Sequence, residues 1–280
     1  MVKHMQAHWM PITRSIFLAM GMLWLPIEAF EGLSNKEASL PFGLFIALSV
    51  IIGIGFYFLD GYRLTGFLKK SIEIKKHGLE TKIFVEFGNV IGRKGWIAIA
   101  VNDFFDSNVD EDLVSSHSLH GRILSKFWPD NRDDWKKQIR SSLKGEPTTK
   151  EARSKGNNLR FPIGTTGRAT TGDNKFLFVA LGKTDSSNNV TTASAEALIC
   201  AVRGMLSKAR AACSYEPLSI PLMGSGLSRT GIKKSVLVDL MIAAILEETR
   251  QAKVTDTITV VLPVSLDGEI NLQNYLRNWN

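Results

Sequence analysis

The sequence predicts an α/β domain with a mixed sheet, preceded by a hairpin of two transmembrane helices. Three features of the 280 residues support this prediction. Two long apolar runs lie near the N-terminus, strand and helix patterns alternate in the remainder, and three polar or glycine-rich turns each follow a short apolar strand. We therefore expect residues 1–62 to form the hairpin, residues 63–80 a basic juxtamembrane linker, and residues 81–280 the α/β domain.

The hairpin prediction rests on the two apolar runs. Ser15–Ile27 belongs to a first helix, expected over about residues 12–30, and Leu40–Leu59, which has no charged residue, to a second over about residues 40–60. A helix of about 20 apolar residues crosses a hydrocarbon core of roughly 30 Å. A signal peptide is the alternative for the first run, but no clear small-residue cleavage site follows it and a second apolar segment comes at once. Together the two runs favour a membrane hairpin.

Basic residues predict the orientation of this hairpin. Lys3 and Arg14 precede the first helix. The basic residues that follow the second helix are Arg63, Lys69, Lys70, Lys75 and Lys76. Because positive charge marks the cytoplasmic side, we expect a multi-pass protein of the cell inner membrane, with both termini and the α/β domain in the cytoplasm. Part of the formal charge of +7 thus lies beside anionic lipid headgroups, which argues against a nucleic-acid partner.

The first half of the α/β domain contains two predicted strands and two predicted helices. The strands Lys82–Ile91 and Trp96–Val101 are separated by a tight turn, so we expect them to pair as a hairpin. Apolar residues at helical spacing predict a helix within Ser115–Trp128 and an amphipathic helix near Arg132–Leu143. The polar stretch Gly145–Asn158 is expected to be a flexible connection.

The second half alternates strands and helices. The predicted strands are Leu159–Ile163, Phe176–Leu181, Leu218–Met223 and Thr257–Leu262, and the predicted helices are Ala193–Ala212 and Ile232–Thr249. This order favours a mixed sheet with helices on both faces over a purely parallel one. The two cysteines, Cys200 and Cys213, indicate neither a disulfide framework nor a cysteine-rich zinc site.

Three turns in this domain are typical of a nucleotide-binding rim. They begin at Asn102, Gly164 and Gly224, and each follows a short apolar strand. Main-chain N–H groups and small hydroxyls suit a diphosphate, and the amide of Asn102 suits ribose hydroxyls. A purely structural role for each turn is the alternative. The Walker A pattern is absent, and Gly224–Arg229 lacks the third glycine of the dinucleotide fingerprint.

The sequence indicates no catalytic residue and no metal site. His117 and His120 lie three residues apart without nearby cysteines, which is weak support for zinc. No nucleophile elbow is present. General acid–base catalysis by His120 or Asp103 stays open, although nothing in the spacing requires it.

Two groups of residues resemble known families. Ile220–Leu227, with the upstream strand end Val101–Asp103, resembles the macro domain, a three-layer α/β/α fold that binds ADP-ribose. Ser118–Gly121 and Phe161–Thr166, joined to two N-terminal apolar helices, are similar to the membrane-anchored macro effectors of type II Thoeris anti-phage systems. The resemblance covers nearly the whole chain and implies that residues 81–280 form a macro domain.

The resemblance implies a function in antiviral defence. A partner TIR enzyme makes a nucleotide signal from NAD, a histidine-ADP-ribose conjugate in characterised systems, and the macro domain binds it. The protein then forms a homo-oligomer and disrupts the lipid membrane. Such an effector is expected not to be an enzyme and to need no cofactor or metal. Its ligand is an ADP-ribose derivative. A membrane-tethered hydrolase acting on ADP-ribosylated protein or an NAD derivative is the alternative.

The resemblance also implies a set of ligand-binding residues. The Asn102 loop would face the distal ribose, Gly224–Leu227 would wrap the diphosphate, and Gly164–Thr166 would add pocket wall. Asn89 stands where many macro domains have an aspartate that bonds the adenine amino group, and an amide can also bond adenine. The full set is Asn89, Asn102, Asp103, Phe104, Ser118, His120, Gly121, Gly164, Thr165, Thr166, Gly224, Ser225, Gly226 and Leu227.

Overall fold

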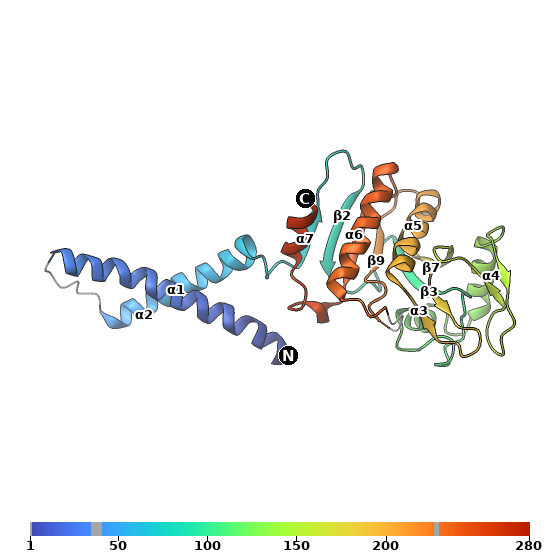
Figure 1. The fold of residues 1–280 in the computed structure, drawn as a ribbon, viewed down its shortest axis with the longest axis horizontal. Coiled ribbons are helices and arrows are strands. Elements are labelled where there is room, and N and C mark those ends of the chain that lie inside the picture. Colours follow the sequence, from blue (N-terminus) through green and yellow to red (C-terminus); the bar gives the residue numbers. More distant parts are fainter. Residues whose placement is uncertain (1, 35–40, 227–229) are drawn as a thin grey trace. The chain divides into compact units, whose positions relative to one another are not determined.

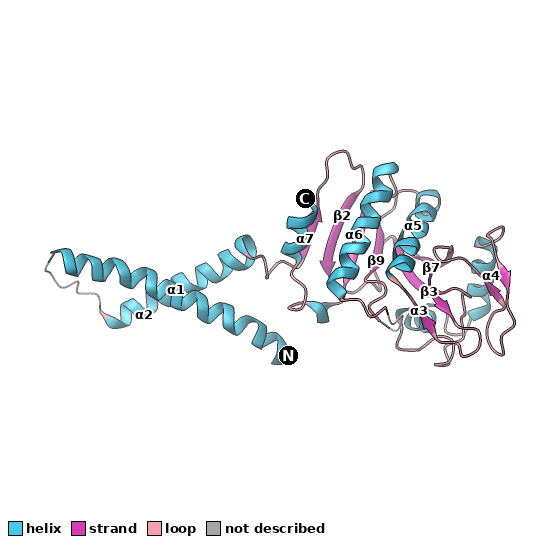
Figure 2. Cartoon of the chain, viewed as in Figure 1, coloured by secondary structure: helices cyan, strands magenta, loops and turns pink. Residues whose placement is uncertain are grey.

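The computed structural model describes residues 2–34, 41–226 and 230–280, which form two compact units (Figures 1 and 2). The first unit contains residues 1–70 and 265–277, and the second contains residues 71–264 and 278–280. Leu227 of the predicted ligand-binding set and Leu40, where the second predicted helix begins, lie outside the described residues.

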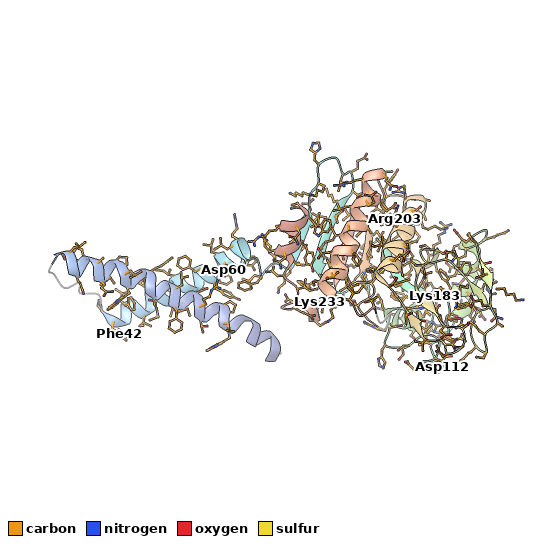
Figure 3. All side chains as sticks on the ribbon, in the orientation of Figure 1. Phe42, Asp60, Asp112, Lys183, Arg203 and Lys233 are labelled. Atoms are coloured by element: carbon orange, nitrogen blue, oxygen red, sulfur yellow. The ribbon has the colours of Figure 1, made fainter. Side chains whose placement is uncertain are left out.

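Two helices make up most of the first unit. Helix α1 (Val2–Ser34) begins well before the predicted residue 12, and helix α2 (Phe42–Leu59) continues into a π-helical turn, η1 (Asp60–Leu64). Both have a stretch long and apolar enough to cross a membrane, Trp9–Ser34 and Phe42–Leu64. Most of each stretch is exposed, unlike a helix in the core of a globular domain, and Figure 3 shows Phe42 and Asp60 at the two ends of α2.

Small residues let α1 and α2 pack closely. A Cβ atom added to Gly53 would lie 2.7 Å from the Cα atom of Ile16, so this crossing requires glycine. Ser15 and Ser49 are buried, and their hydroxyls donate to carbonyl oxygens one turn earlier in their own helices, at 2.9 Å and 2.8 Å. Arg14 and Asp60 form an ion pair between the two helices at 3.4 Å. The two buried hydroxyls are thus hydrogen-bonded where α1 and α2 cross.

The second unit is built on a mixed sheet with the strand order β1-β2-β10-β9-β3-β7-β6, and β8 pairs with β7. Neighbouring strands from β2 to β7 in this order are parallel, whereas β1, β6 and β8 pair antiparallel. The strands are β1 (Ser71–Ile74), β2 (Lys82–Phe87), β3 (Trp96–Asn102), β6 (Thr166–Thr171), β7 (Asn174–Thr184), β8 (Thr191–Thr192), β9 (Leu218–Pro221) and β10 (Thr257–Leu262). Five parallel strands therefore end at one edge of the sheet.

Helices cover both faces of this sheet. Alternate residues of β3 and β7, such as Ile99 and Phe178, are buried in one cluster with α3 (Leu119–Phe127) and α4 (Arg132–Ser142). The residues between them in β7, such as Leu177, are buried on the opposite face, where α5 (Ala195–Ala212) and α6 (Lys234–Gln251) pack. The predicted three-layer α/β/α fold with a mixed sheet is confirmed.

The predicted hairpin of Lys82–Ile91 with Trp96–Val101 is wrong. β2 and β3 are parallel, and β10 and β9 lie between them. The eight residues after β2 form a crossover instead of a turn, and Val90 within it is buried in the same cluster as α3 and α4. β3 starts where the N–H of Trp96 donates to the carbonyl of Pro217 at 2.8 Å, beside β9.

Several elements differ from the sequence-based expectation. Ser71–Ile74, expected in the linker, is an edge strand because Ile72 and Ile74 alternate into the core. The turn expected after Gly164 contains β6, and the polar connection contributes β4 (Thr149–Lys150), which pairs with β5 (Leu159–Arg160). The short helices η2 (Val264–Leu266) and α7 (Leu272–Trp279) had no predicted counterpart.

Helix α4 protects the edge strand β6. The side-chain amide of Gln138 donates to the carbonyl of Thr170 at 3.0 Å and accepts from its N–H at 2.8 Å. The hydroxyl of Ser142 accepts from the N–H of Arg168 at 2.9 Å. Side chains thus satisfy main-chain groups that an unpaired edge would expose.

Gly204 in α5 packs directly on the main chain of Gly164. A Cβ atom at Gly204 would overlap the Gly164 carbonyl, so we expect Gly204→Ala to lower the free energy of unfolding by about 1–3 kcal/mol. Alanine is the better helix former by about 1 kcal/mol, so propensity alone predicts the opposite sign. Chemical denaturation of the full chain measures the change, with Ser207→Ala at an exposed α5 position as the control. A stabilised Gly204→Ala protein would contradict this packing.

Candidate ligand-binding cleft

A cleft lies at the edge where the parallel strands end. Its larger lobe, about 330 Å³, is lined by residues that follow β2, β9 and β10 and by the start of α3. A smaller lobe of about 120 Å³ lies beside it and shares Ala100, Ser118 and His120 with the larger one. This is the position in which open α/β sheets bind their ligands. The two lobes are called the cleft below.

The glycine loop after β9 forms one wall of the larger lobe. Gly224 has a φ of +76°, and a Cβ atom there would lie 3.1 Å from the Thr230 side chain. The hydroxyls of Ser225 and Thr230 donate to the carbonyls of Leu222 and Gly224, at 3.0 Å and 2.9 Å. These bonds fix the loop through its carbonyls. Within the described part of the chain, the N–H groups of Gly224, Ser225 and Gly226 make no hydrogen bond, so they can donate to an anion.

The start of α3 forms the opposite wall. Ser118 caps the helix, because its hydroxyl accepts from the Gly121 N–H at 2.9 Å and donates to the Ser115 carbonyl at 2.7 Å. A Cβ atom at Gly121 would overlap the Ser115 carbonyl, so glycine is required there. Arg122, which sequence reasoning missed, lies one helical turn after Ser118 and also lines the lobe. Its spacing from Ser118 was the available signal.

His120 lines both lobes and is held neutral. Its side chain is 6% exposed, and its ring lies 5.8 Å from the rings of Trp135 and of Phe178. Burial, together with the charge of Arg132, lowers the pKa of His120 to about 3. Its Nε2 atom has no hydrogen-bond partner among the described residues. A neutral imidazole whose buried Nε2 is unpaired among the described residues therefore lies beside the cleft.

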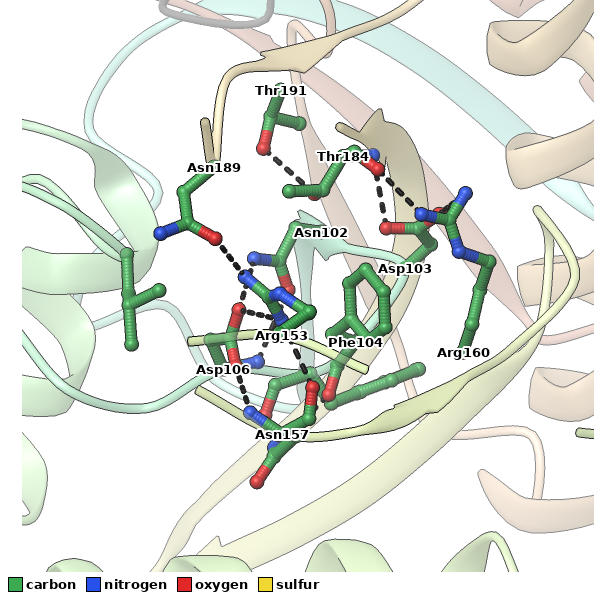
Figure 4. A network of polar contacts seen from close by, with 12 residues as sticks. Asn102, Asp103, Phe104, Asp106, Arg153, Asn157, Arg160, Thr184, Asn189 and Thr191 are labelled. Atoms are coloured by element: carbon green, nitrogen blue, oxygen red, sulfur yellow. Dashed lines mark hydrogen bonds and ion pairs between the residues drawn. The ribbon is translucent and has the colours of Figure 1, made fainter. Parts of the chain in front are cut away.

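Asn102 lines the smaller lobe, and a buried polar network fixes its side chain (Figure 4). The Asn102 amide donates to Asp106 Oδ2 at 2.8 Å and accepts from the Asp106 N–H at 3.0 Å. Asp106 in turn forms an ion pair with Arg153 at 3.0 Å, and both side chains are at most 1% exposed. Arg153 also donates to Asn189 Oδ1 at 2.7 Å. The orientation of Asn102 is thus set before any ligand binds.

The segment that carries Arg153 is bonded to the turn after β3. The N–H of Asn157 donates to Asp106 Oδ1 at 2.8 Å, and its amide donates to the carbonyls of Phe104 and Phe105 at 3.0 Å and 2.9 Å. These residues fall within the stretch expected to be a flexible connection. Its polar composition gave no signal that Arg153 would be buried.

Five predicted site residues lie away from the cleft lining. Asp103 accepts from the Thr184 N–H at 3.0 Å and pairs with Arg160 at 3.3 Å, and burial raises the pKa of its carboxyl. Phe104 is buried beneath the guanidinium groups of Arg153 and Arg160. The other three are Gly164 and Thr165, in a turn that packs on α5, and Thr166, the first residue of β6, whose hydroxyl donates to the Gly164 carbonyl.

The remaining predicted residues that the structure describes lie in or beside the cleft. Asn89, Asn102, Ser118, His120 and Gly224–Gly226 line it, and Gly121 supports the start of α3. Across residues 2–34, 41–226 and 230–280, no group of three or more His, Cys, Asp or Glu side chains is arranged to hold a metal ion.

Breaking the Asp106–Arg153 pair tests its role in the fold. Asp106→Asn leaves a buried guanidinium without its carboxylate, so we expect a loss of about 3–5 kcal/mol in unfolding free energy. The exposed pair of Asp112 with Lys155 serves as the control, because Asp112→Asn should cost only about 0–1 kcal/mol. Denaturant unfolding of the full chain measures both values. Similar losses for the two variants would show that burial gives the Asp106 pair no special role.

The neutral state of His120 predicts a pH dependence of stability. Its pKa is about 3 in the folded protein against an ordinary value of 6.5, so the unfolded chain binds more protons between these values. Protonation of this histidine in the unfolded chain therefore lowers the free energy of unfolding by about 2 kcal/mol as the pH falls from about 7 to about 5. Denaturation at both pH values should show that His120→Gln removes this component and that exposed His117→Gln retains it. Equal pH dependence in wild type and His120→Gln would refute the assignment.

Sequence comparison identifies the second unit's relatives. Residues 83–263 match the family described as "Thoeris protein ThsA, Macro domain". A curated relative, the Thoeris protein ThsA of Bacillus amyloliquefaciens (strain Y2), is 23% identical over 190 residues, which cover 66% of this chain and 61% of the relative. The match thus spans less than two thirds of that relative's length.

Structure comparison supports the same fold. The Oceanobacillus iheyensis macrodomain with ADP is similar with a TM-score of 0.52 and 14% identity, covering 74% of this chain and 97% of that one. A variant of that macrodomain with ADPR has a TM-score of 0.52 and 15% identity, covering 74% and 99%. At these identities the likeness shows the fold alone. Because the family model matches more than half of the chain, the chain belongs to the family of Thoeris ThsA macro-domain proteins.

Proposed function

We propose that this protein is a ligand-gated membrane effector of anti-phage defence. Its macro domain binds an ADP-ribose-type nucleotide, a histidine-ADP-ribose conjugate made by a partner TIR enzyme, and the protein then oligomerises and disrupts the membrane. The observation that carries this proposal is the glycine loop with free N–H groups in a cleft at the carboxyl edge of the sheet. The same chain has two helices long and apolar enough to cross a membrane.

The cleft has the chemistry that a diphosphate and its flanking groups require. Arg122 lines the larger lobe, and no Asp or Glu among the described residues lines either lobe, so a bound anion meets no opposing carboxylate. The free N–H groups of Gly224–Gly226 would bind the diphosphate, and Asn102 the distal ribose. In Asn89 the amide oxygen already accepts from the Ile91 N–H at 3.0 Å, which leaves its NH₂ group free for a ring nitrogen of adenine.

The composition of the cleft favours binding over hydrolysis. A hydrolase needs a group that activates water, and effective general bases have a pKa near the working pH. His120, with a pKa of about 3, is a weak base, and Asp103 is held by Thr184 and Arg160 outside the cleft lining. Incubation with labelled ADP-ribosylated protein separates the two functions. Turnover would support the tethered hydrolase, whereas stoichiometric binding without product supports the effector.

The first unit offers a route by which ligand binding could reach the hairpin. Pro263 lines the cleft, and Ser265, two residues later, begins the C-terminal segment of the first unit. That segment contacts the stretch that follows α2. The contacts are Asn271 to the Thr65 carbonyl at 3.0 Å, Arg277 to the Leu64 carbonyl at 2.6 Å, Lys69 to Gln273 at 2.7 Å, and a Lys70–Asp267 ion pair. We therefore propose that residues 265–277 transmit occupancy of the cleft to α2.

Gating imposes a thermodynamic condition. A ligand drives assembly only if it has higher affinity for the assembled state than for the resting one.

The basic residues that flank the two helices support the proposed orientation in the inner membrane, with both termini and the macro domain in the cytoplasm. The cleft would then face the compartment in which a nucleotide signal is made.

Filling the space beside the glycine loop tests whether this loop binds the ligand. Gly224→Val places a β-branched residue at positive φ beside Thr230 and removes the space next to the free N–H groups, so we expect ADP-ribose affinity to fall at least about tenfold. Calorimetry on the full chain in detergent measures the affinity. Gly172→Val is the matched control, since Gly172 also has positive φ but lies in the β6–β7 turn. Unchanged affinity in Gly224→Val would refute the loop assignment.

Ligand binding should also change the size of the assembly. Analytical ultracentrifugation of the same samples is expected to show a larger oligomer with ligand in the wild type and in Gly172→Val, and none in Gly224→Val. A ligand that binds tightly without any change in size would rule out gating by assembly while leaving the binding site intact.

A further inference from the structure

A second and larger cavity lies apart from the cleft. It has a volume of about 620 Å³ and is formed by α4, the turn after β3 and the chain around β5, and we call it the α4 cavity. No described residue lines both the α4 cavity and either lobe of the cleft. The proposed function does not use it. Its volume is within the range of about 300–1,000 Å³ that is usual for small-molecule sites.

The floor of the α4 cavity is aromatic and aliphatic. Phe105 and Phe161 meet edge to face, with ring centroids 5.3 Å apart. Ile139 and Leu143 of the α4 region are buried beside them, whereas Leu159 stays 49% exposed at the rim. Such a surface favours a flat or apolar group over a fully hydrated one.

One side of the α4 cavity carries unpaired positive charge. Lys136, Arg140 and Lys144 are spaced four residues apart, which places them along one face of the helix and its continuation. Lys136 forms an ion pair with Asp133 at 3.2 Å, whereas the charged groups of Arg140 and Lys144 form no ion pair or hydrogen bond with any described residue. Glu146 is the single acidic residue in the described lining, and it lies 3.8 Å from Lys208. The local charge is therefore positive and available to an anion.

The remaining wall offers fixed polar groups. Asn157 is tied to the buried Asp106 through its N–H and to the Phe104 and Phe105 carbonyls through its NH₂ group. Its amide oxygen and the side chain of Asn158 make no hydrogen bond with other described residues. These amides can pair with the edge of a heterocyclic base, which an alkyl chain could not use. The wall is held in place by the buried network and needs little reordering on binding.

We propose that the α4 cavity is a second ligand site, for a nucleoside phosphate. The base contacts Phe105 and Phe161 and bonds to the amides of Asn157 and Asn158, and the phosphate binds Arg140 and Lys144. This site is independent of the proposed role of the cleft, since the two linings have no residue in common within the described chain.

AMP binding to the full chain in detergent tests this site, with the cleft blocked by Gly224→Val. Gly226→Val is a second blocking variant, because an added Cβ atom there meets nothing within 4 Å and the fold should tolerate it. We expect each blocked protein to bind one equivalent of AMP by equilibrium dialysis. Adding Arg140→Ala and Lys144→Ala should weaken that binding at least tenfold. Lys137→Ala with Lys150→Ala, which removes the same charge from exposed positions outside the cavity lining, should leave it within twofold.

Three results would overturn the proposal. The first is no AMP binding by either blocked protein at millimolar concentration. The second is an equal loss of affinity in the two double-alanine variants, which would indicate a general charge effect. The third is displacement of AMP by decanoate but not by GMP or CMP, which would mean that the cavity selects acyl chains over nucleoside phosphates.

Discussion

The common direction of five strands is the constraint on which the site depends. Because β2, β10, β9, β3 and β7 are parallel neighbours, their carboxyl ends meet at one edge, and segments that follow each of them line the cleft. The crossover after β2 brings Asn89 to this edge, and β9 delivers the glycine loop. A hairpin of β2 with β3 would have sent these segments to opposite ends of the sheet. The position of the lining segments thus depends on strand direction more than on any single side chain.

Buried polar interactions then fix what the strands bring together. The ion pair of Asp106 with Arg153 holds the Asn102 amide, and through Asn157 it also holds one wall of the α4 cavity. His120 stays neutral beside Trp135, which itself lines the α4 cavity. The cleft and the α4 cavity therefore have separate linings, but the same buried network holds residues of both. A substitution in this network is expected to alter both cavities.

The sequence predicted local structure well and long-range pairing poorly. Thr257–Leu262 has the bounds predicted for it, and the α5 helix differs from its prediction by two residues at one end, because continuous apolar runs and helical spacing are local signals. β2 pairs with β10 and β3 pairs with β9, strands that lie more than a hundred residues later, and no local pattern encodes that choice. In the site, the glycine loop and Asn102 could be predicted from turns after strands. The burial of Arg153 could not, because a polar stretch with Gly, Ser, Lys and Asn has the composition of a flexible connection.

In the proposed function, a nucleotide in the cleft controls the two apolar helices. Dye release from liposomes that contain the reconstituted full chain tests it most directly, with ADP-ribose and its histidine conjugate added separately. The account predicts release that begins on addition of a ligand that binds the cleft and that is lost in Gly224→Val. Release without any nucleotide, or tight binding with no release, would contradict it.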